Sequence, residues 1–375
     1  MTKTANYVIL YKIDIKAGLA LRGKWFAVIS FAFILFRLLC ASFASAEEAA
    51  AEEQDEQLVL TFAGDCTLGA EGWLQGYASS FVQVVREKGF DWPLSGVLDL
   101  FLEDDLTLVN LEGTFTVCDK AADKSFTFRA PPEFAEILPL GSVEAVNLAN
   151  NHTMDYGVQG FEDTIAALDA QGVAHCGQDC PAVVEAKGRK IALLGFTYPL
   201  ANARLTALYE EIEAYRERED IALIVVSFHW GREMTYEPRA DQIRTAHAAI
   251  DHGADVVVGT HPHVLQSMEM YNGKPIFYSL GNFCFGGDGR PPDFDTAVMR
   301  LAYNVTDGGL RLARLEVIPC SISQQPQSKT QDFRPVKVEG DDAARILKKL
   351  SKGARGFAEG FFETGLWIGD LEAEP

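Results

Sequence analysis

Five predicted strands end in side chains that bind hard or borderline metal ions. The residues that follow these strands are Asp65, Glu112, Asn151 with His152, His229, and His261 with His263. Oxygen and imidazole ligands suit Mn, Fe or Zn, whereas thiolates suit softer sites. Two carboxylates, an amide and several imidazoles suffice for two divalent ions with an edge left open for substrate. Because such clusters mark metal or catalytic sites, the sequence predicts a metal centre here.

The stretch over residues 145–157 shows the pattern most clearly. Apolar residues 145–148 predict a buried strand, and Asn150, Asn151 and His152 follow before a helix that begins near Val158. In open α/β sheets, ligands bind at the carboxyl ends of the strands. A polar turn that caps the next helix is the alternative explanation of this stretch taken alone. The other strand ends favour the ligand interpretation.

Alternating strands and helices would position these residues. Strands are predicted over residues 57–63, 105–109, 145–148, 182–186, 190–196, 221–228, 254–259, 264–270, 275–278 and within 296–318, and helices over 78–89, 94–103, 204–219, 238–252 and 341–353. Residues 221–228 are so apolar that this strand is expected to lie centrally in a sheet. We find no internal repeat and no linker, and so predict one α/β domain over residues 58–320. A C-terminal extension, residues 321–375, would pack its helix on that domain.

The first 46 residues have the layout of an export signal. Basic residues precede an apolar run over residues 25–36, and Ala44-Ser45-Ala46 fits a cleavage site. We predict a signal peptide or an uncleaved membrane anchor over residues 1–46 and an acidic leader over residues 47–57. The protein is therefore expected to be exported to the cell envelope, on its periplasmic or extracellular face.

Charge and cysteine content limit the partners. The net charge of −20 argues against nucleic-acid binding, which needs a basic face. An anionic substrate would need a local positive centre, which bound metal ions supply. Six of the seven cysteines follow residue 46, and an even number in an exported protein permits disulfides. Cys176 and Cys180 could close a short loop.

Six ordered motifs over about residues 58–320 resemble a known family. They are Gly64-Asp65, Asn110-Leu111-Glu112-Gly113, Ala149-Asn150-Asn151-His152 with Asp155-Tyr156-Gly157, His229-Trp230-Gly231 with Glu233, Gly259 with His261-Pro262-His263, and Ser279-Leu280-Gly281-Asn282-Phe283. The family is that of the bacterial capsule synthesis protein CapA, associated with poly-γ-glutamate and part of the calcineurin-like metallophosphoesterase superfamily. The resemblance implies a four-layer α/β/β/α sandwich with a two-metal site.

The resemblance also implies what individual residues do. The metal ligands would be Asp65 and His263 for one ion, Asn151, His229 and His261 for the other, and Glu112 as the bridge between them. His152 would approach the leaving oxygen, and Asp155 would orient it. A water between the ions would be the nucleophile.

The chain departs from the superfamily pattern in two places. Thr67 stands where the superfamily has the His of an Asp-x-His motif, and Glu112 replaces the usual bridging Asp. One ion therefore loses an imidazole. Cys66 or Cys284 could compensate, although both could equally be small buried thiols.

Four further residues are candidate substrate contacts: Arg129, Trp230, Arg232 and Asn282. The arginines could bind a carboxylate or a phosphate, or form surface salt bridges. Trp230 could stack on substrate or simply pack in the core.

Two classes of function fit these observations. The first is a metal-dependent hydrolase acting on a phosphoester or on another bond in an exported anionic polymer. The second is a non-catalytic polymer-binding or assembly factor, which could belong to a membrane capsule-synthesis complex. The water-bridging ligand set favours the hydrolase, and the missing imidazole favours the binding factor.

Overall fold

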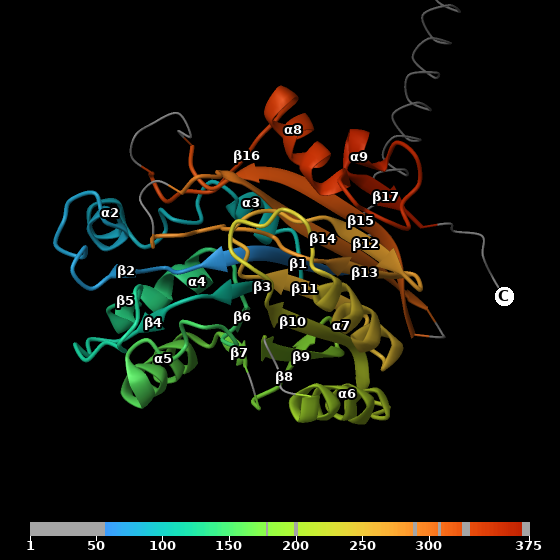
Figure 1. Ribbon diagram of the computed structural model, residues 1–375, viewed down its shortest axis with the longest axis horizontal. Helices are drawn as coiled ribbons and strands as arrows, with labels where there is room; N and C mark the ends of the chain where they lie inside the picture. The colour runs from blue at the N-terminus through green and yellow to red at the C-terminus, as the bar shows by residue number, and fades with distance from the viewer. Residues whose placement is uncertain are drawn as a thin grey trace, which may run out of the picture. The chain divides into compact units, whose positions relative to one another are not determined.

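The computed structural model describes residues 57–177, 179–198, 202–287, 291–306, 309–324 and 331–369. The predicted export signal and acidic leader lie outside these residues, except Gln57, which begins the first strand. Two large β-sheets carry helices on their outer faces (Figure 1). Among the described residues, no helix is both long enough and apolar enough to span a membrane.

The first sheet has the strand order β16-β15-β14-β1-β3-β6-β7, with β17 paired to β15. Its strands are β1 (Gln57–Cys66), β3 (Leu106–Leu111), β6 (Ala145–Asn147), β7 (Ala174–Cys176), β14 (Asp295–Thr306), β15 (Gly309–Ser321), β16 (Val336–Lys337) and β17 (Leu366–Ile368). β1, β3, β6 and β7 pair in parallel. Their carboxyl ends therefore share one edge of the sheet.

The second sheet has the order β12-β13-β11-β10-β9-β8. Its strands are β8 (Ala182–Ala186), β9 (Arg189–Thr197), β10 (Ile221–His229), β11 (Val256–Thr260), β12 (Met268–Tyr271) and β13 (Lys274–Phe277). β9, β10, β11 and β13 are parallel, and β8 and β12 are antiparallel edge strands. A small third sheet joins β2 (Ala70–Glu71), β5 (Phe128–Ala130) and β4 (Thr114–Phe115).

Alternation along the strands explains why both faces of each large sheet are buried. Leu108 of β3 and Val225 of β10 belong to one core between the sheets. The next residue on β3, Val109, packs instead among the helices α2 (Phe81–Lys88), α3 (Leu98–Phe101), η1 (Pro132–Glu136), α4 (Ile137–Leu140) and α5 (Gly157–Gln171). Val226 of β10 likewise packs against α6 (Asn202–Arg216) and α7 (Ala240–Asp251). Successive strand residues point to opposite faces, so such strands read as unbroken apolar runs.

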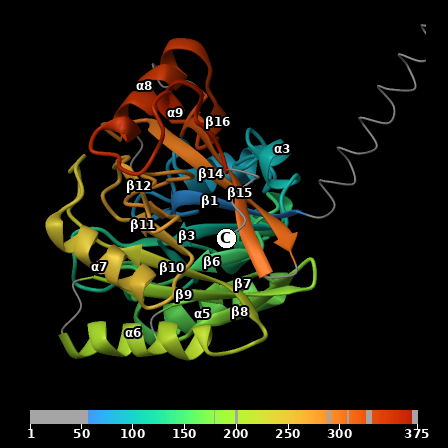
Figure 2. The ribbon, with the colours of Figure 1, turned by 90° about the vertical axis from the view of Figure 1, so that its right-hand side faces the viewer.

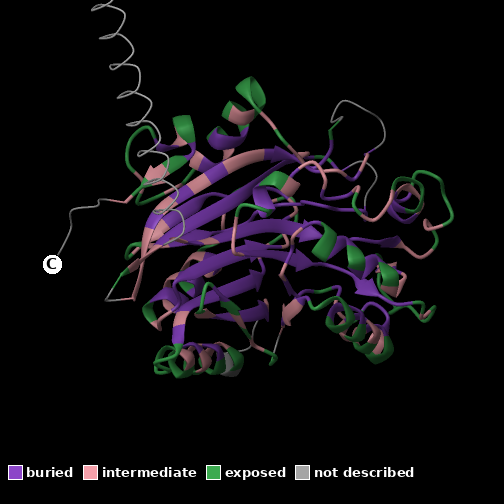
Figure 3. Ribbon diagram, turned by 180° about the vertical axis from the view of Figure 1, so that it is seen from behind, coloured by how far each residue is buried: buried purple, intermediate pink, exposed green. Residues whose placement is uncertain are grey.

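The layers are therefore helices, first sheet, second sheet and helices. Figure 2 shows α6 and α7 along the outer side of the second sheet. Figure 3 shows buried strands between helices with exposed outer turns. The predicted four-layer α/β/β/α sandwich is confirmed.

The C-terminal residues complete the first sheet. β16 and β17 both pair with β15, and the predicted boundary at residue 320 falls inside that strand. Helix α8 (Gly340–Ser351) buries Ile346, Leu347 and Leu350 in the core shared by the two sheets, and α9 (Phe361–Thr364) adds Phe361.

Candidate metal centre

The two sheets bring their strand ends to one place. In the first sheet, Asp65 near the end of β1 lies opposite Asn110 of β3. Glu112 is the first residue after β3. In the second sheet, His229 ends β10 opposite Thr260, the last residue of β11. Donors from both sheets therefore meet where the parallel strands end, as open α/β sheets lead one to expect.

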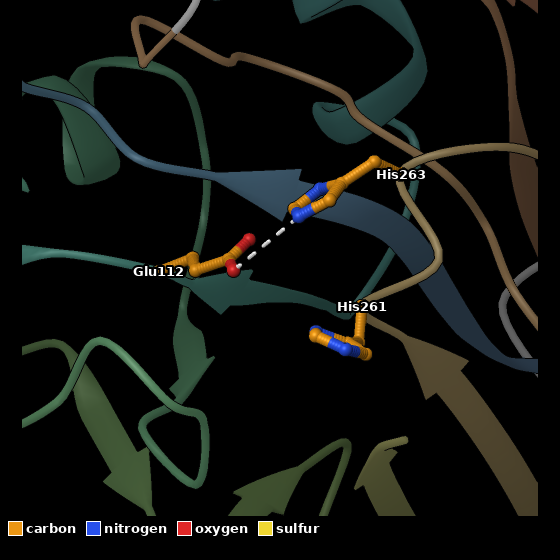
Figure 4. A group of neighbouring side chains, drawn as sticks. All are labelled: Glu112, His261 and His263. Carbon is orange, nitrogen blue, oxygen red and sulfur yellow. Dashed lines mark ion pairs between the residues drawn. The ribbon is translucent and has the colours of Figure 1, made fainter. Parts of the chain in front are cut away.

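Glu112 lies at the middle of the cluster. Its Oε1 atom is 3.4 Å from Nε2 of His229 and 3.8 Å from Nε2 of both His263 and His152. Glu112, His261 and His263 offer ligand atoms that all lie within 4.8 Å of one another, and Figure 4 shows the three side chains converging.

His229 links the remaining predicted ligands. Its Nε2 atom is 2.6 Å from Oδ1 of Asn151 and 3.1 Å from Nδ1 of His261. On the other side of the ring, Nδ1 lies 3.1 Å from the Thr260 hydroxyl and 3.3 Å from the Asn110 amide nitrogen. These contacts behind the ring hold Nε2 toward the cluster, which is how imidazole ligands are oriented.

The residues fit a divalent cation. Glu112 is fully buried, and none of the described residues donates a hydrogen bond to either of its carboxylate oxygens. An isolated buried carboxylate is costly unless it is paired or binds a metal ion. Burial, helped by the negative charge of Asp65, raises the pKa of Glu112 to about 8. A bound cation would compensate both carboxylates.

The other carboxylate, Asp65, is already held. Its Oδ1 atom accepts a hydrogen bond from the Asn110 amide at 2.7 Å, and Oδ2 accepts one from the His261 backbone N–H at 3.2 Å. Burial opposes ionisation, but the hydrogen bond and positive charge of His263 bring the pKa of Asp65 below its usual value. Asp65 is thus ready to bind a cation as a carboxylate.

The imidazoles differ in charge. Burial lowers the pKa of both His229 and His261 to about 4, so both are neutral at pH 7, the form that binds metal ions. Burial would also lower the pKa of His263, but the Glu112 and Asp65 carboxylates raise it to about 10. In the metal-free protein the imidazolium of His263 therefore balances part of the carboxylate charge, and His263 would lose this proton on binding a metal ion.

The backbone of the histidine turn is unusual. The segment His261-Pro262-His263 is not extended, because His261 has φ +96° and His263 has φ +57°. Non-glycine residues rarely adopt positive φ, and such strain concentrates at functional sites. The turn directs both rings toward Glu112 (Figure 4).

His152 and Asp155, the predicted proton-transfer pair, lie beside the predicted ligands. His152 is buried, with its ring 4.5 Å from that of Phe128. Its Nδ1 atom lies 2.7 Å from Oδ2 of the fully buried Asp155, and Nε2 faces Glu112. The carboxylate therefore fixes the orientation of the ring, and the catalytic roles of both residues stay predictions.

The departure at Thr67 has a structural explanation. Thr67 is buried, and its hydroxyl accepts a hydrogen bond from the Gly286 N–H at 2.6 Å. The Cys66 and Cys284 thiols lie in the apolar core on the outer face of the first sheet, where burial raises the pKa of Cys66 to about 12. Cys66 follows Asp65 on β1 and so points away from the cluster, which means that neither thiol replaces the missing imidazole.

The cysteines of the described residues are all free, at positions 66, 118, 176, 180, 284 and 320. The loop closure considered for Cys176 and Cys180 is therefore not formed.

The four candidate substrate residues have different surroundings. Trp230 is fully buried and donates its indole N–H to the Tyr278 carbonyl at 2.8 Å, so it packs in the core. Arg129 donates to the carbonyls of Val117 and Cys118 and lies over the Tyr156 ring. Both residues support the structure around the site.

The other two candidate substrate residues are Asn282 and Arg232. Asn282 is buried, with Oδ1 2.9 Å from Nδ1 of His263, so it orients a predicted ligand. Arg232 is exposed on the turn after β10, where a substrate contact stays a prediction.

Sequence reasoning missed Asn110, Thr260 and Lys124. Asn110 and Glu112 are two residues apart at the end of β3, and that spacing places their side chains on one face, a usable signal. Thr260 precedes His261 in a motif that was recognised. Lys124 lies in a largely exposed loop, where the sequence carries no pattern that would single out one lysine. The Nζ atom of Lys124 nevertheless lies 2.7 Å from Oδ1 of Asp155.

A family model described as "Bacterial capsule synthesis protein PGA_cap" matches residues 59–287. The chain belongs to this family. Among curated relatives of this capsule synthesis family, the PGA biosynthesis protein CapA of Bacillus subtilis (strain 168) is 31% identical over 319 residues, covering 80% of this chain and 79% of the relative. The capsule biosynthesis protein CapA of Bacillus anthracis is 30% identical over 347 residues, covering 84% and 80%.

Two solved structures are also similar. A hypothetical protein from Thermus thermophilus matches with a TM-score of 0.44 and 18% identity, covering 70% of this chain and 98% of that protein. The sulfate thiohydrolase SoxB of Thermus thermophilus matches with a TM-score of 0.39 and 12% identity, covering 70% and 56%.

Proposed function

We propose that this member of the capsule synthesis family is a metal-dependent hydrolase of the metallophosphatase type. One observation carries the proposal: the buried carboxylate of Glu112 lies among four imidazoles, and none of the described residues donates a hydrogen bond to it. Asp65, Asn151, His229, His261 and His263 would complete the ligands of two ions. Oxygen and imidazole donors of this kind suit Mn, Fe or Zn.

The substrate would be an anionic polymer or a phosphoester. The Bacillus subtilis relative is named for PGA biosynthesis, and the Bacillus anthracis relative for capsule biosynthesis. We infer that poly-γ-glutamate, or a phosphoester met during its synthesis, reaches this centre. Two cations there would add local positive charge to a chain whose net charge is −20.

The chain's own residues divide the remaining work. Divalent ions, when bound, acidify a water and stabilise negative charge on an oxyanion. His152 faces the ligand cluster through Nε2, while Asp155 accepts the hydrogen bond from Nδ1–H. As an imidazolium, His152 would give the Nε2 proton to the leaving oxygen, which is general acid catalysis. Phe128 covers one face of the ring and limits its movement.

The test combines metal content with turnover. We would purify residues 47–375 and measure bound metal by mass spectrometry. Hydrolysis of p-nitrophenyl phosphate, bis(p-nitrophenyl) phosphate and γ-glutamate oligomers would then be assayed with added Mn. About two metals per chain and turnover that is lost in Asp65→Ala are expected. His252→Ala is the matched control, because His252 lies at the far end of α7 and pairs with Glu213.

The second candidate is a polymer-binding or assembly factor without turnover. The observation that favours it is Thr67, which leaves one ion with fewer protein ligands than the other. Binding of γ-glutamate oligomers by the metal-loaded protein, with no product from any substrate, would support this function and overturn the hydrolase.

We also propose that the protein acts at the cell envelope, exported or anchored by residues 1–46 and working beside a membrane capsule-synthesis complex. The apolar run before a small-residue cleavage motif supports this. Protease treatment of spheroplasts, in which the periplasmic face of the inner membrane is accessible, followed by immunoblotting, tests it. A protein protected in intact spheroplasts and degraded only after their lysis would contradict the proposal.

A further inference from the structure

A lysine outside the predicted ligand set contacts His152 and Asp155, the carboxylate that orients it. Lys124 lies in a largely exposed segment between β4 and β5, residues 117–127, which we call the strap. Its side chain is only 30% exposed, because the ammonium group turns inward.

The ammonium group contacts three parts of one turn. Its Nζ atom lies 2.7 Å from Oδ1 of Asp155, 2.8 Å from the carbonyl oxygen of Asn151 and 3.2 Å from Nδ1 of His152. Asn151, His152 and Asp155 are respectively a predicted metal ligand, the predicted proton donor and the carboxylate that orients that donor. One side chain from the strap therefore contacts all three.

Asp155 also accepts two backbone hydrogen bonds, one from within the strap and one from Phe128, the β5 residue that directly follows the strap. Its carbonyl oxygen accepts the Ala122 N–H at 2.7 Å, and its Oδ2 atom accepts the Phe128 N–H at 2.6 Å. The carboxylate is fully buried, whereas the strap is mostly exposed. A buried carboxylate is stable only when it is paired and hydrogen-bonded, and Lys124 supplies the positive charge.

We propose that Lys124 is a positioning residue. It holds Asp155, and through Asp155 the His152 ring, in the orientation that directs Nε2 to the metal centre, and it docks the strap beside that centre. The effect on proton transfer rests on the proposed hydrolase function, but the docking of the strap does not.

The docking is tested by hydrogen exchange on the full chain. Lys124→Met is compared with Lys124→Arg and with Lys120→Met, which removes an exposed lysine of the same strap. In Lys124→Met we expect the Ala122 and Phe128 amides to exchange about tenfold faster or more, since a charge-assisted bond that holds their acceptor is lost. Bound metal should be unchanged, and Lys124→Arg should restore most of the protection. Wild-type exchange rates in Lys124→Met would overturn the proposal.

The kinetic arm separates positioning from substrate binding. Lys124→Met should lower kcat by about 10- to 100-fold, the usual cost of losing an orienting partner, with KM close to the wild-type value. Recovery in Lys124→Arg is expected, because arginine keeps the charge. A rise in KM alone would mean that Lys124 binds substrate, which contradicts positioning. If the wild-type protein turns over no substrate, the hydrolase function fails, while the exchange rates still decide whether Lys124 docks the strap.

Discussion

The amide oxygen Oδ1 of Asn151 lies 2.6 Å from Nε2 of His229, although the residues are 78 positions apart. Asn151 follows β6 of the first sheet, and His229 ends β10 of the second. The contact therefore crosses from one sheet to the other, and the proposed metal centre would form only where both sheets pack together. Ligand substitutions should consequently change metal binding more than they change the fold.

Replacing an imidazole ligand tests this directly. His229→Ala removes the ring that reaches Asn151, His261 and Glu112, so we expect it to lose most of the bound metal. Metal per chain is measured after dialysis, beside His252→Ala. Full metal content in His229→Ala would remove His229 from the ligand set.

Glu112→Gln should separate stability from metal binding. Burial raises the pKa of Glu112, which means that a charged carboxylate is unfavourable there in the metal-free protein, and glutamine removes that charge while keeping a similar shape. In EDTA, we expect the free energy of unfolding to stay within about 1 kcal/mol of wild type.

Added Mn should then distinguish the two proteins. Wild type should gain about 2.7 kcal/mol at a hundredfold excess over Kd, and Glu112→Gln much less. Urea unfolding with EDTA and with Mn measures both differences. An equal gain in the two proteins would show that Glu112 is not a ligand.

Loss of His152 should depend on the leaving group. His152→Ala should keep its metal and lower the turnover of an alkyl phosphate ester by about 10²- to 10⁴-fold, the range for general acid catalysis. p-Nitrophenyl phosphate should suffer less, since nitrophenolate leaves without a proton. Steady-state rates on the two esters give the comparison, and equal losses on both would argue against proton donation by His152.

Asp104 should make stability depend on pH, away from the metal centre. Its Oδ2 atom accepts the Thr107 hydroxyl at 2.6 Å, and none of the described residues donates a hydrogen bond to the buried Oδ1. Burial, opposed by the Thr107 bond and helped by the charge of Glu144, raises its pKa from 3.8 to about 7. The folded state therefore binds the proton of Asp104 more tightly than the unfolded state does. Protonated Asp104 contributes its full share to the free energy of unfolding below pH 4, and this share is lost as the pH rises to about 7.

Asp104→Asn should not show this loss. At pH 8 we expect the variant to be more stable than wild type by about 1–3 kcal/mol, with the gap closing toward pH 4. Urea unfolding at several pH values measures it, with the exposed Asp119→Asn as control. A gap that does not change with pH would contradict the raised pKa.

Much of this architecture can be read from the sequence, because strands buried on both faces leave unbroken apolar runs such as residues 221–228. Such strands place their polar residues at the ends, and this is why Asp65, Glu112 and His229 could be grouped from the sequence alone. The short C-terminal strands β16 and β17 carry too few residues for a pattern. They form because the edge of β15 offers unpaired backbone groups.

What the sequence did not reveal depends on tertiary contacts. His261 has a positive φ, and in this conformation its backbone N–H donates a hydrogen bond to Asp65, a residue 196 positions away. Lys124 reaches Asp155 across 31 positions, from a segment without periodicity. Trp230 beside a ligand suggested a substrate contact, but its indole N–H is used by Tyr278. Local patterns predict which residues can bind a metal, and the packing decides which neighbours orient them.

The buried hydroxyl of Thr67 accepts a hydrogen bond from the Gly286 N–H. The loop that contains Gly286 also carries Asn282, whose Oδ1 atom contacts His263. Replacing Thr67 with histidine would remove that hydrogen bond and place a larger ring in a buried position, so we expect this single substitution not to restore the imidazole that the sequence resemblance implied. The two ions of this centre would therefore differ in how readily they exchange, and a change toward equal sites would need coordinated changes in β1 and in the loop after β13.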